Sequence, residues 1–125
     1  MKKIIQTSSA PAPIGPYNQA VLVDNTLYVS GQIAIDPVSG HMIQDNLVIE
    51  TKQALENARA ILQAADMDFS NVVKATIFIL DMANFVTINE VYATYFKSDF
   101  PARETVAVAG LPKGANVEIS FIAVK

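Results

Sequence analysis

Two runs of the sequence, Val72–Leu80 and Val117–Val124, carry apolar residues at both odd and even positions. Successive side chains of a β-strand point to opposite faces, so these runs predict strands that need apolar cover on both sides. A sheet covered on one side only would leave a broad apolar surface in water. The fold must therefore cover two sheet faces, either with its own helices or with copies of itself.

Only two segments have the spacing of an amphipathic helix. Apolar residues recur at intervals of three and four positions from Leu47 to Ala65, which predicts a helix packed on a sheet. A second helix is predicted before Pro101, with an apolar stripe formed by Phe85, Ile88, Tyr92, Tyr95 and Phe96.

The remaining apolar runs predict strands. A short strand is expected at Ile4–Gln6, a hairpin around the Asp24-Asn25 turn, a central strand at Val72–Leu80, and two last strands at Glu104–Ala109 and Val117–Val124. Helices separated by single strands cannot easily cover opposite sides of so small a sheet. The pattern thus predicts an α+β fold, a mixed six-stranded sheet with two helices on one face, and oligomerisation through the other.

Length and charge limit the class of protein. A chain of 125 residues, 51% apolar and 17% charged, predicts one globular domain spanning 1–125. The net charge of −3 disfavours nucleic-acid binding. No uninterrupted apolar stretch approaches the length of a membrane span. Lys2-Lys3 precede only two strongly apolar residues, too few for a secretory signal, so the cytoplasm is the expected location.

Few residue types are available for catalysis or ligand binding in this sequence. The chain has no cysteine and one histidine, which excludes a thiol nucleophile and predicts no structural zinc site or iron–sulfur cluster. His41 follows Gly40 in a predicted turn and is expected on the surface. Arginine, carboxylates, hydroxyls and backbone amides remain as candidates.

The two arginines lie in different settings. Arg59 is expected on the solvent side of the first helix. Arg103 follows Pro101-Ala102 at the start of a strand, where its planar fork could bind a carboxylate or a phosphate. The alternative for Arg103 is a surface ion pair with Asp99 or Glu104.

Glu118 and Asn89 are polar residues in apolar settings. Glu118 interrupts the last apolar strand; partial burial would raise the pKa of this carboxyl and suit it to act as an acid, a base or a water holder, whereas a solvent-facing Glu118 would be inert. Asn89 falls about 40° from Phe85 around the second helix and so borders its apolar stripe. Its amide needs a ligand or a facing backbone group as partner.

Two loop features are further candidates. Tyr17 follows Gly15-Pro16 in a proline-rich segment and could close over a site or plug the edge of the core. Ser30 and Gly31 end the hairpin, where exposed amides could bind an anion or the chain could simply bend.

Five motifs taken together resemble the Rid family (reactive intermediate deaminases, also called YjgF or enamine/imine deaminases). They are IGPY at 14–17, YVSGQ at 28–32, NEVY at 89–92, PAR at 101–103 and LPKGANVEI at 111–119. The likeness covers nearly the whole chain, and the last two motifs are the most specific.

The resemblance implies a chorismate-mutase-like fold assembled as a homotrimer, whose sheets face inward as a barrel and whose active sites lie between subunits. It also implies hydrolysis of 2-imino acids, such as 2-iminobutanoate and 2-iminopropanoate, to 2-keto acids and ammonia without a metal or organic cofactor. Such imines arise from enamines released by pyridoxal-phosphate enzymes such as threonine dehydratase.

The resemblance further places Arg103 on the substrate carboxylate and Glu118 at the water, in a pocket lined by Tyr17, Ser30, Gly31, Asn89 and Thr105. Many relatives carry cysteine where this chain has Thr105. Hydrolysis of an imine needs no thiol, because its carbon is already electrophilic and an oriented water suffices.

The spacing of Arg103 and Glu118 along the chain predicts a site shared between subunits. Counted from Lys113, Arg103 lies about ten residues back and Glu118 about five forward, a mismatch of ~16 Å along a strand. An arginine side chain spans less than half of that. We therefore expect Arg103 of one subunit to meet Glu118 of a neighbour.

Two other functions fit the same residues. A non-catalytic regulatory trimer could use Arg103 to bind small carboxylates. Some relatives are also described as ribonucleases or translation inhibitors, which the negative charge and the lack of a basic aromatic surface disfavour here.

Overall fold

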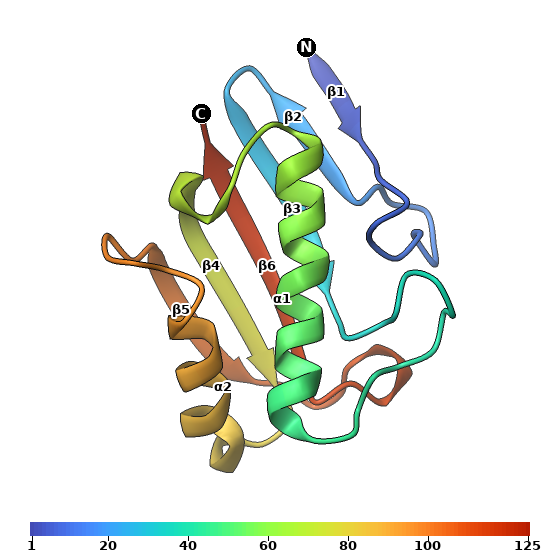
Figure 1. Cartoon of the computed structure of the whole chain (residues 1–125), viewed down its shortest axis with the longest axis vertical. Helices are drawn as coiled ribbons and strands as arrows, with labels where there is room; N and C mark the ends of the chain where they lie inside the picture. Colours follow the sequence, from blue (N-terminus) through green and yellow to red (C-terminus); the bar gives the residue numbers. More distant parts are fainter.

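The computed structural model describes all residues, 1–125, as an α+β fold with six strands and two α-helices (Figure 1). The elements follow the predicted order. They are β1 (Lys2–Ile5), β2 (Ala20–Val23), β3 (Thr26–Gln32), α1 (Leu47–Ala64), β4 (Val72–Ile79), α2 (Phe85–Ala93), β5 (Ala102–Ala107) and β6 (Val117–Val124), with 3₁₀ turns at Phe69–Asn71, Met82–Asn84 and Pro112–Gly114.

The strands form one mixed sheet in the order β1-β2-β3-β6-β4-β5. All neighbours are antiparallel except β4 and β5, which run parallel. The β2–β3 hairpin turns at Asp24-Asn25 as predicted, with Asp24 in the left-handed region at φ 53°. Strand β6 therefore lies beside β4, and β5 reaches the sheet only through β4.

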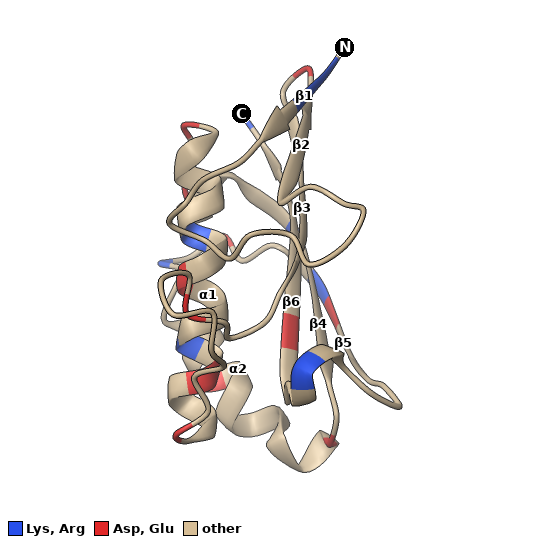
Figure 2. Cartoon of the chain, turned by 90° about the vertical axis from the view of Figure 1, so that its right-hand side faces the viewer, with Lys and Arg blue, Asp and Glu red and all other residues tan.

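Both helices lie on one face of the sheet, as predicted; in the edge-on view no helix covers the other face (Figure 2). Helix α1 begins at the Asn46 cap, whose Oδ1 accepts a hydrogen bond of 2.9 Å from the amide of Ile49. Its apolar stripe packs against α2, β3 and β6 over one large core. Residues such as Leu55, Ile61 and Ile119 are fully buried there.

The helix-free face is only partly covered. Along β6 the residues facing the helices are buried, from Val117 to Ala123, while those facing away, including Ile122, are half-buried or exposed. The same alternation runs along β4, where Val73 is 48% exposed. Within the chain the second face of β4 has no cover, because both helices lie on the other side; its predicted cover by copies of the chain stays a prediction.

The second helix is shorter than predicted. It ends at Ala93, and Tyr95 and Phe96 follow in tighter turns whose amides bond to carbonyls three residues back. The hydroxyl of Thr94 donates to the carbonyl of Val91 at 2.6 Å, which satisfies a helix-end acceptor locally. Strand β5 also starts two residues earlier than predicted, because pairing with β4 begins at Ala102.

Candidate active site

Arg103 lies on the helix side of β5 and faces α2. Its Nη1 donates a hydrogen bond of 2.6 Å to Oδ1 of Asn89. Its guanidinium carbon stands 5.0 Å from the ring centre of Tyr92 and 5.7 Å from that of Phe85. The alternative partners do not hold it: neither Asp99 nor Glu104 forms an ion pair with Arg103, and Glu104 pairs with Lys74 instead.

An open hollow of about 410 Å³ adjoins this guanidinium. Its walls are Asn89, Tyr92, Ala93, Phe100, Pro101 and Arg103. No carboxylate lines it, so the positive charge of Arg103 is not neutralised within the chain. A half-buried cation with a neutral amide as its only polar partner favours an anionic ligand.

Two buried hydroxyls lie near Arg103. Thr105 follows Arg103 by two residues in β5 and therefore shares its face of the sheet. Its Oγ1 and the hydroxyl oxygen of Tyr92 are both buried without a hydrogen-bond partner. Burial raises the pKa of Tyr92 to about 12, against the opposing effect of the Arg103 charge, so this hydroxyl stays protonated at neutral pH.

Glu118 lies on the opposite side of the sheet, in β6, beside the glycine of β3. A Cβ on Gly31 would stand 2.7 Å from Cδ and 2.9 Å from Cγ of Glu118, so the glycine makes room for this carboxylate. Burial raises the pKa of Glu118 above its usual value, and no cation of the chain pairs with it. The solvent-facing alternative is therefore wrong for Glu118.

A second, smaller hollow of about 50 Å³ opens at Glu118. Its lining includes Tyr17 and Gly31, together with Pro11, Ala12, Ile14, Gln19, Gln32, Ile33, Ile35 and Pro112. Tyr17 is 45% exposed, and its hydroxyl accepts a hydrogen bond of 3.3 Å from the amide of Ile14. The proline-rich loop thus forms one wall of the carboxylate pocket.

Buried polar contacts fix that loop. Gln19, 3% exposed, donates to the carbonyls of Thr7, Ala10 and Pro11 and accepts from the amide of Thr7 at 2.7 Å. The hydroxyl of Ser30 donates to the carbonyl of Asn18 at 2.6 Å. In this chain Ser30 therefore holds the loop against β3.

The predicted site residues form two separate groups. Arg103 pairs in the sheet with Ala75, whereas Glu118 pairs with Phe78. Ala75 and Phe78 are three residues apart in one strand, so their side chains and those of their partners point to opposite faces. One chain cannot bring Arg103 and Glu118 into a single pocket.

We predicted this separation from the distance along a hairpin formed by the strands of Arg103 and Glu118. That hairpin is wrong, because β4 lies between β5 and β6. The separation arises instead from the two faces of the sheet. Arg103, Asn89 and Thr105 form one group on the helix side; Tyr17, Gly31 and Glu118, with Ser30 behind them, form a second group on the other side.

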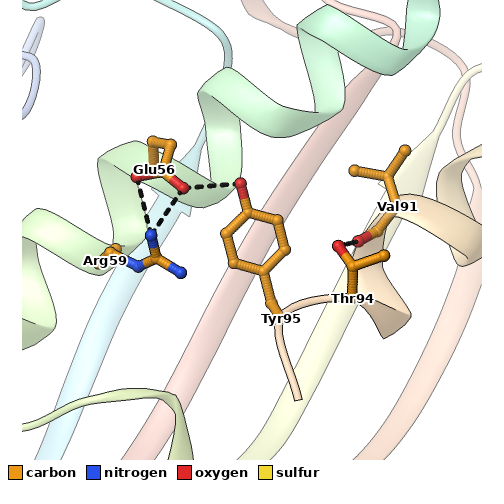
Figure 3. A network of polar contacts seen from close by, with 5 residues as sticks. All are labelled: Glu56, Arg59, Val91, Thr94 and Tyr95. Atoms are coloured by element: carbon orange, nitrogen blue, oxygen red, sulfur yellow. Dashed lines mark hydrogen bonds and ion pairs between the residues drawn. The ribbon is translucent and has the colours of Figure 1, made fainter. Parts of the chain in front are cut away.

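Arg59, the other arginine, is neutralised within the chain (Figure 3). Its Nη1 lies 3.0 Å from Oε2 of Glu56, which also accepts a hydrogen bond of 2.7 Å from the hydroxyl of Tyr95. Arg59 also adjoins a larger hollow of about 470 Å³. That hollow contains none of the predicted site residues and has carboxylates of Asp68 and Asp99 in its wall.

No group of three or more His, Cys, Asp or Glu side chains is arranged to hold a metal ion. His41 is exposed in its turn, as predicted. None of the helices has both the length and the apolar character needed to cross a bilayer.

Sequence reasoning did not identify Phe85 and Tyr92 as neighbours of Arg103. Both were assigned to the apolar stripe of the second helix, to which they also belong. The available signal was the spacing of Phe85, Asn89 and Tyr92, at i, i+4 and i+7, which places an amide between two rings on one helix face.

Comparison with known proteins gives consistent matches over the chain. Residues 7–125 match the family model described as endoribonuclease L-PSP. The 2-iminobutanoate/2-iminopropanoate deaminases of Bos taurus and Homo sapiens are 55% and 51% identical over 125 residues, covering 100% of this chain and 91% of each relative. A Yersinia pestis crystal structure, described as of the conserved Rid protein family, is 45% identical with a TM-score of 0.97 and full coverage of both chains.

Proposed function

Because this chain belongs to the Rid family, we propose that it is a 2-iminobutanoate/2-iminopropanoate deaminase, an enzyme that hydrolyses reactive 2-imino acids to 2-keto acids and ammonia. One observation carries the substrate class: the guanidinium of Arg103 adjoins an open hollow and has no carboxylate partner in its own chain. A small α-imino carboxylate supplies that missing charge.

In this proposal Arg103 binds the substrate carboxylate. Asn89 takes one N–H of Nη1, which leaves the other N–H groups of the fork for two parallel hydrogen bonds to the carboxylate. The imine carbon is thereby held at a fixed distance from the guanidinium. Thr105 follows Arg103 by two residues on the edge strand β5, and in this proposal its backbone contacts the bound acid.

Glu118 acts on the water. The carboxylate removes a proton as the water oxygen forms a bond to the imine carbon, and the electron pair of the C=N bond moves to nitrogen. Glu118 then returns this proton to nitrogen, which gives a carbinolamine. In a second transfer through Glu118 the hydroxyl proton moves to nitrogen, the C–N bond breaks with its electron pair going to nitrogen, and ammonia leaves as the carbonyl forms. The pKa of Glu118, raised by burial, suits both proton transfers. Neither step needs a metal or an organic cofactor, because the imine carbon is already electrophilic.

In this proposal the Arg103 group and the Glu118 group come together between subunits. Arg103 and Glu118 point to opposite faces of one sheet, so a complete site requires Arg103 of one subunit and Glu118 of the next. We propose a homotrimer whose helix-free sheet faces pack inward, which also covers the partly exposed apolar side chains of that face. Tyr17 and Gly31 border the site on the Glu118 side, and Ser30 fixes the Tyr17 loop.

Because free imino acids are short-lived, we expect the enzyme in the compartment where they form. Imino acids of this kind hydrolyse or react with other molecules when free, so an enzyme that removes them acts where they form. We therefore propose a cytoplasmic protein that follows pyridoxal-phosphate-dependent enzymes releasing enamines, such as threonine dehydratase.

The shared site is tested by mixing inactive subunits. Arg103→Ala and Glu118→Gln subunits, unfolded together and refolded at equal amounts, should regain activity at about a quarter of the sites, because one arrangement in four pairs the intact Arg103 with the intact Glu118. Each variant refolded alone is the control and stays inactive. Turnover of imine supplied by threonine dehydratase is the measurement. No recovery in mixed oligomers would refute the shared site.

The same assay decides between enzyme and regulator. A catalyst accelerates imine loss and keto acid formation, whereas a non-catalytic trimer would bind 2-oxobutanoate without changing the rate. Binding without turnover by the unaltered protein would overturn the enzymatic proposal.

Gly31→Ala is expected to lower kcat by about ten- to a hundredfold while changing Tm little. The new Cβ overlaps the carboxylate end of Glu118, which is flexible enough to move but then leaves its position beside the water. Gly110→Ala is the matched control, because a Cβ there meets nothing within 4 Å. Equal activity of the two variants would contradict the role given to the Gly31 position.

A further inference from the structure

Both arginines of this chain rest on two aromatic rings. Arg59 lies over Phe69 and Tyr95, at 5.5 and 5.0 Å, and Arg103 lies over Phe85 and Tyr92, at 5.7 and 5.0 Å. The geometry is nearly the same in the two places. The charge environment differs, because Arg59 is paired with Glu56 and Arg103 is paired with no carboxylate.

One face of helix α2 contacts Arg103. Phe85, Asn89 and Tyr92 follow at i, i+4 and i+7, and each of the three contacts the same guanidinium. The two rings attract the cation through their π faces, and the amide oxygen accepts one N–H in the guanidinium plane. Together these contacts oppose both translation and rotation of the fork.

We infer that Phe85 and Tyr92 are positioning residues that hold the Arg103 guanidinium in the orientation that binds the substrate carboxylate. The inference rests on the proposed function and adds to it the source of the preorganisation. A free arginine side chain has many rotamers, and binding a carboxylate in two parallel hydrogen bonds requires one of them. Contacts already present in the unliganded chain remove that cost before substrate arrives.

In Tyr92 the aromatic ring, and not the hydroxyl, positions the Arg103 guanidinium. The residue is 3% exposed, and its hydroxyl has no hydrogen-bond partner. Removing the hydroxyl alone leaves the cation–π contact in place, whereas removing the ring abolishes it. Tyr92→Phe and Tyr92→Leu therefore separate the two parts of the side chain.

The test compares substrate affinity with turnover. Tyr92→Leu and Phe85→Leu should each raise KM for 2-iminobutanoate and Kd for 2-oxobutanoate about five- to tenfold, with kcat within about twofold of the unaltered enzyme. Tyr92→Phe should return both constants most of the way to the unaltered values. In an Arg103→Lys background Tyr92→Leu should raise KM little further, because the planar fork that it positions is gone.

Tyr95→Leu is the matched control, since it removes the equivalent ring from Arg59 and should leave KM and Kd unchanged. If Tyr92→Leu does not fold, the less buried Phe85→Leu carries the test, with Tm recorded for every variant. An unchanged KM in Phe85→Leu and Tyr92→Leu, or a full additional rise in the Arg103→Lys background, would overturn the inference. Failure of the proposed function has a different signature: Arg103→Lys itself would match the unaltered enzyme in KM and kcat.

Discussion

Arg103→Ala is expected to lower kcat/KM for 2-iminobutanoate about a thousandfold or more, because it removes both the charge and the fork that orient the substrate. The guanidinium bonds to a neutral amide and no carboxylate, so its positive charge is available to the substrate. With alanine at position 103 the hollow can still admit the imino acid. It cannot hold the imine carbon at the position where the water attacks.

The matched control for this variant is Arg59→Ala. It also removes an arginine from two aromatic rings, but one whose charge Glu56 already neutralises. Its kcat/KM should stay within about threefold of the unaltered value, as expected for a surface pair. Steady-state kinetics and thermal unfolding of both variants make the comparison. If Arg103→Ala retains full activity, the catalytic proposal is wrong.

Glu118→Gln is expected to lower kcat by about a hundred- to ten-thousandfold, the usual contribution of a positioned acid–base group. The amide has nearly the same shape as the carboxylate and can still accept a hydrogen bond from water. It cannot take the proton, so the attack on the imine carbon loses its base. A kcat near that of the unaltered enzyme would remove Glu118 from the mechanism.

The pH dependence of kcat gives an independent check on Glu118. Burial raises its pKa, and the base must be ionised, so kcat should fall as pH drops through a value above the usual 4.5 of this carboxyl. In the substrate complex the carboxylate of the substrate neutralises Arg103. The pKa seen in the pH dependence of kcat therefore reflects mainly the burial of Glu118. The acidic limb should be absent from the residual activity of Glu118→Gln.

The same shift predicts a gain in stability. A carboxyl whose pKa is raised in the folded chain opposes folding when it is ionised, above that raised pKa. In an Arg103→Ala background, which removes the cation that the neighbouring subunit places near this carboxyl, Glu118→Gln should therefore raise Tm at neutral pH, and the gain should shrink as pH falls through the raised pKa. A lower Tm after this replacement would indicate that Glu118 stabilises the fold.

Sequence patterns predicted most of the secondary structure because they are local. The helix at Leu47–Ala64 follows from its apolar spacing and its Asn46 cap, and the β2–β3 hairpin from its Asp24-Asn25 turn. Errors occurred where tertiary contacts override spacing. The apolar stripe of α2 continues to Phe96, but the helix ends at Ala93 and the chain turns so that Tyr95 and Phe96 pack their rings on Phe69.

The candidate site residues were predicted one by one, but the sheet faces that they occupy were not. Glu118 interrupts an apolar strand, Asn89 borders the apolar stripe of its helix, and Arg103 follows Pro101-Ala102 at the start of a strand. Their grouping depends on strand register, and β4 joins β5 and β6 through pairings more than twenty residues apart in the chain. No local pattern reports which face Arg103 or Glu118 points to.

The amino-acid sequence alone therefore determined the strands and helices, their order, the placement of both helices on one face, and the family whose motifs the chain carries. The tertiary structure decided that Arg103 faces α2, that Glu118 faces the helix-free side beside Gly31, and that two rings lie against the guanidinium. The physical reason is the distance along the sequence over which each determinant acts. Apolar periodicity and residue chemistry act over a few residues, whereas the face and the neighbours of a side chain are set by pairing between distant strands.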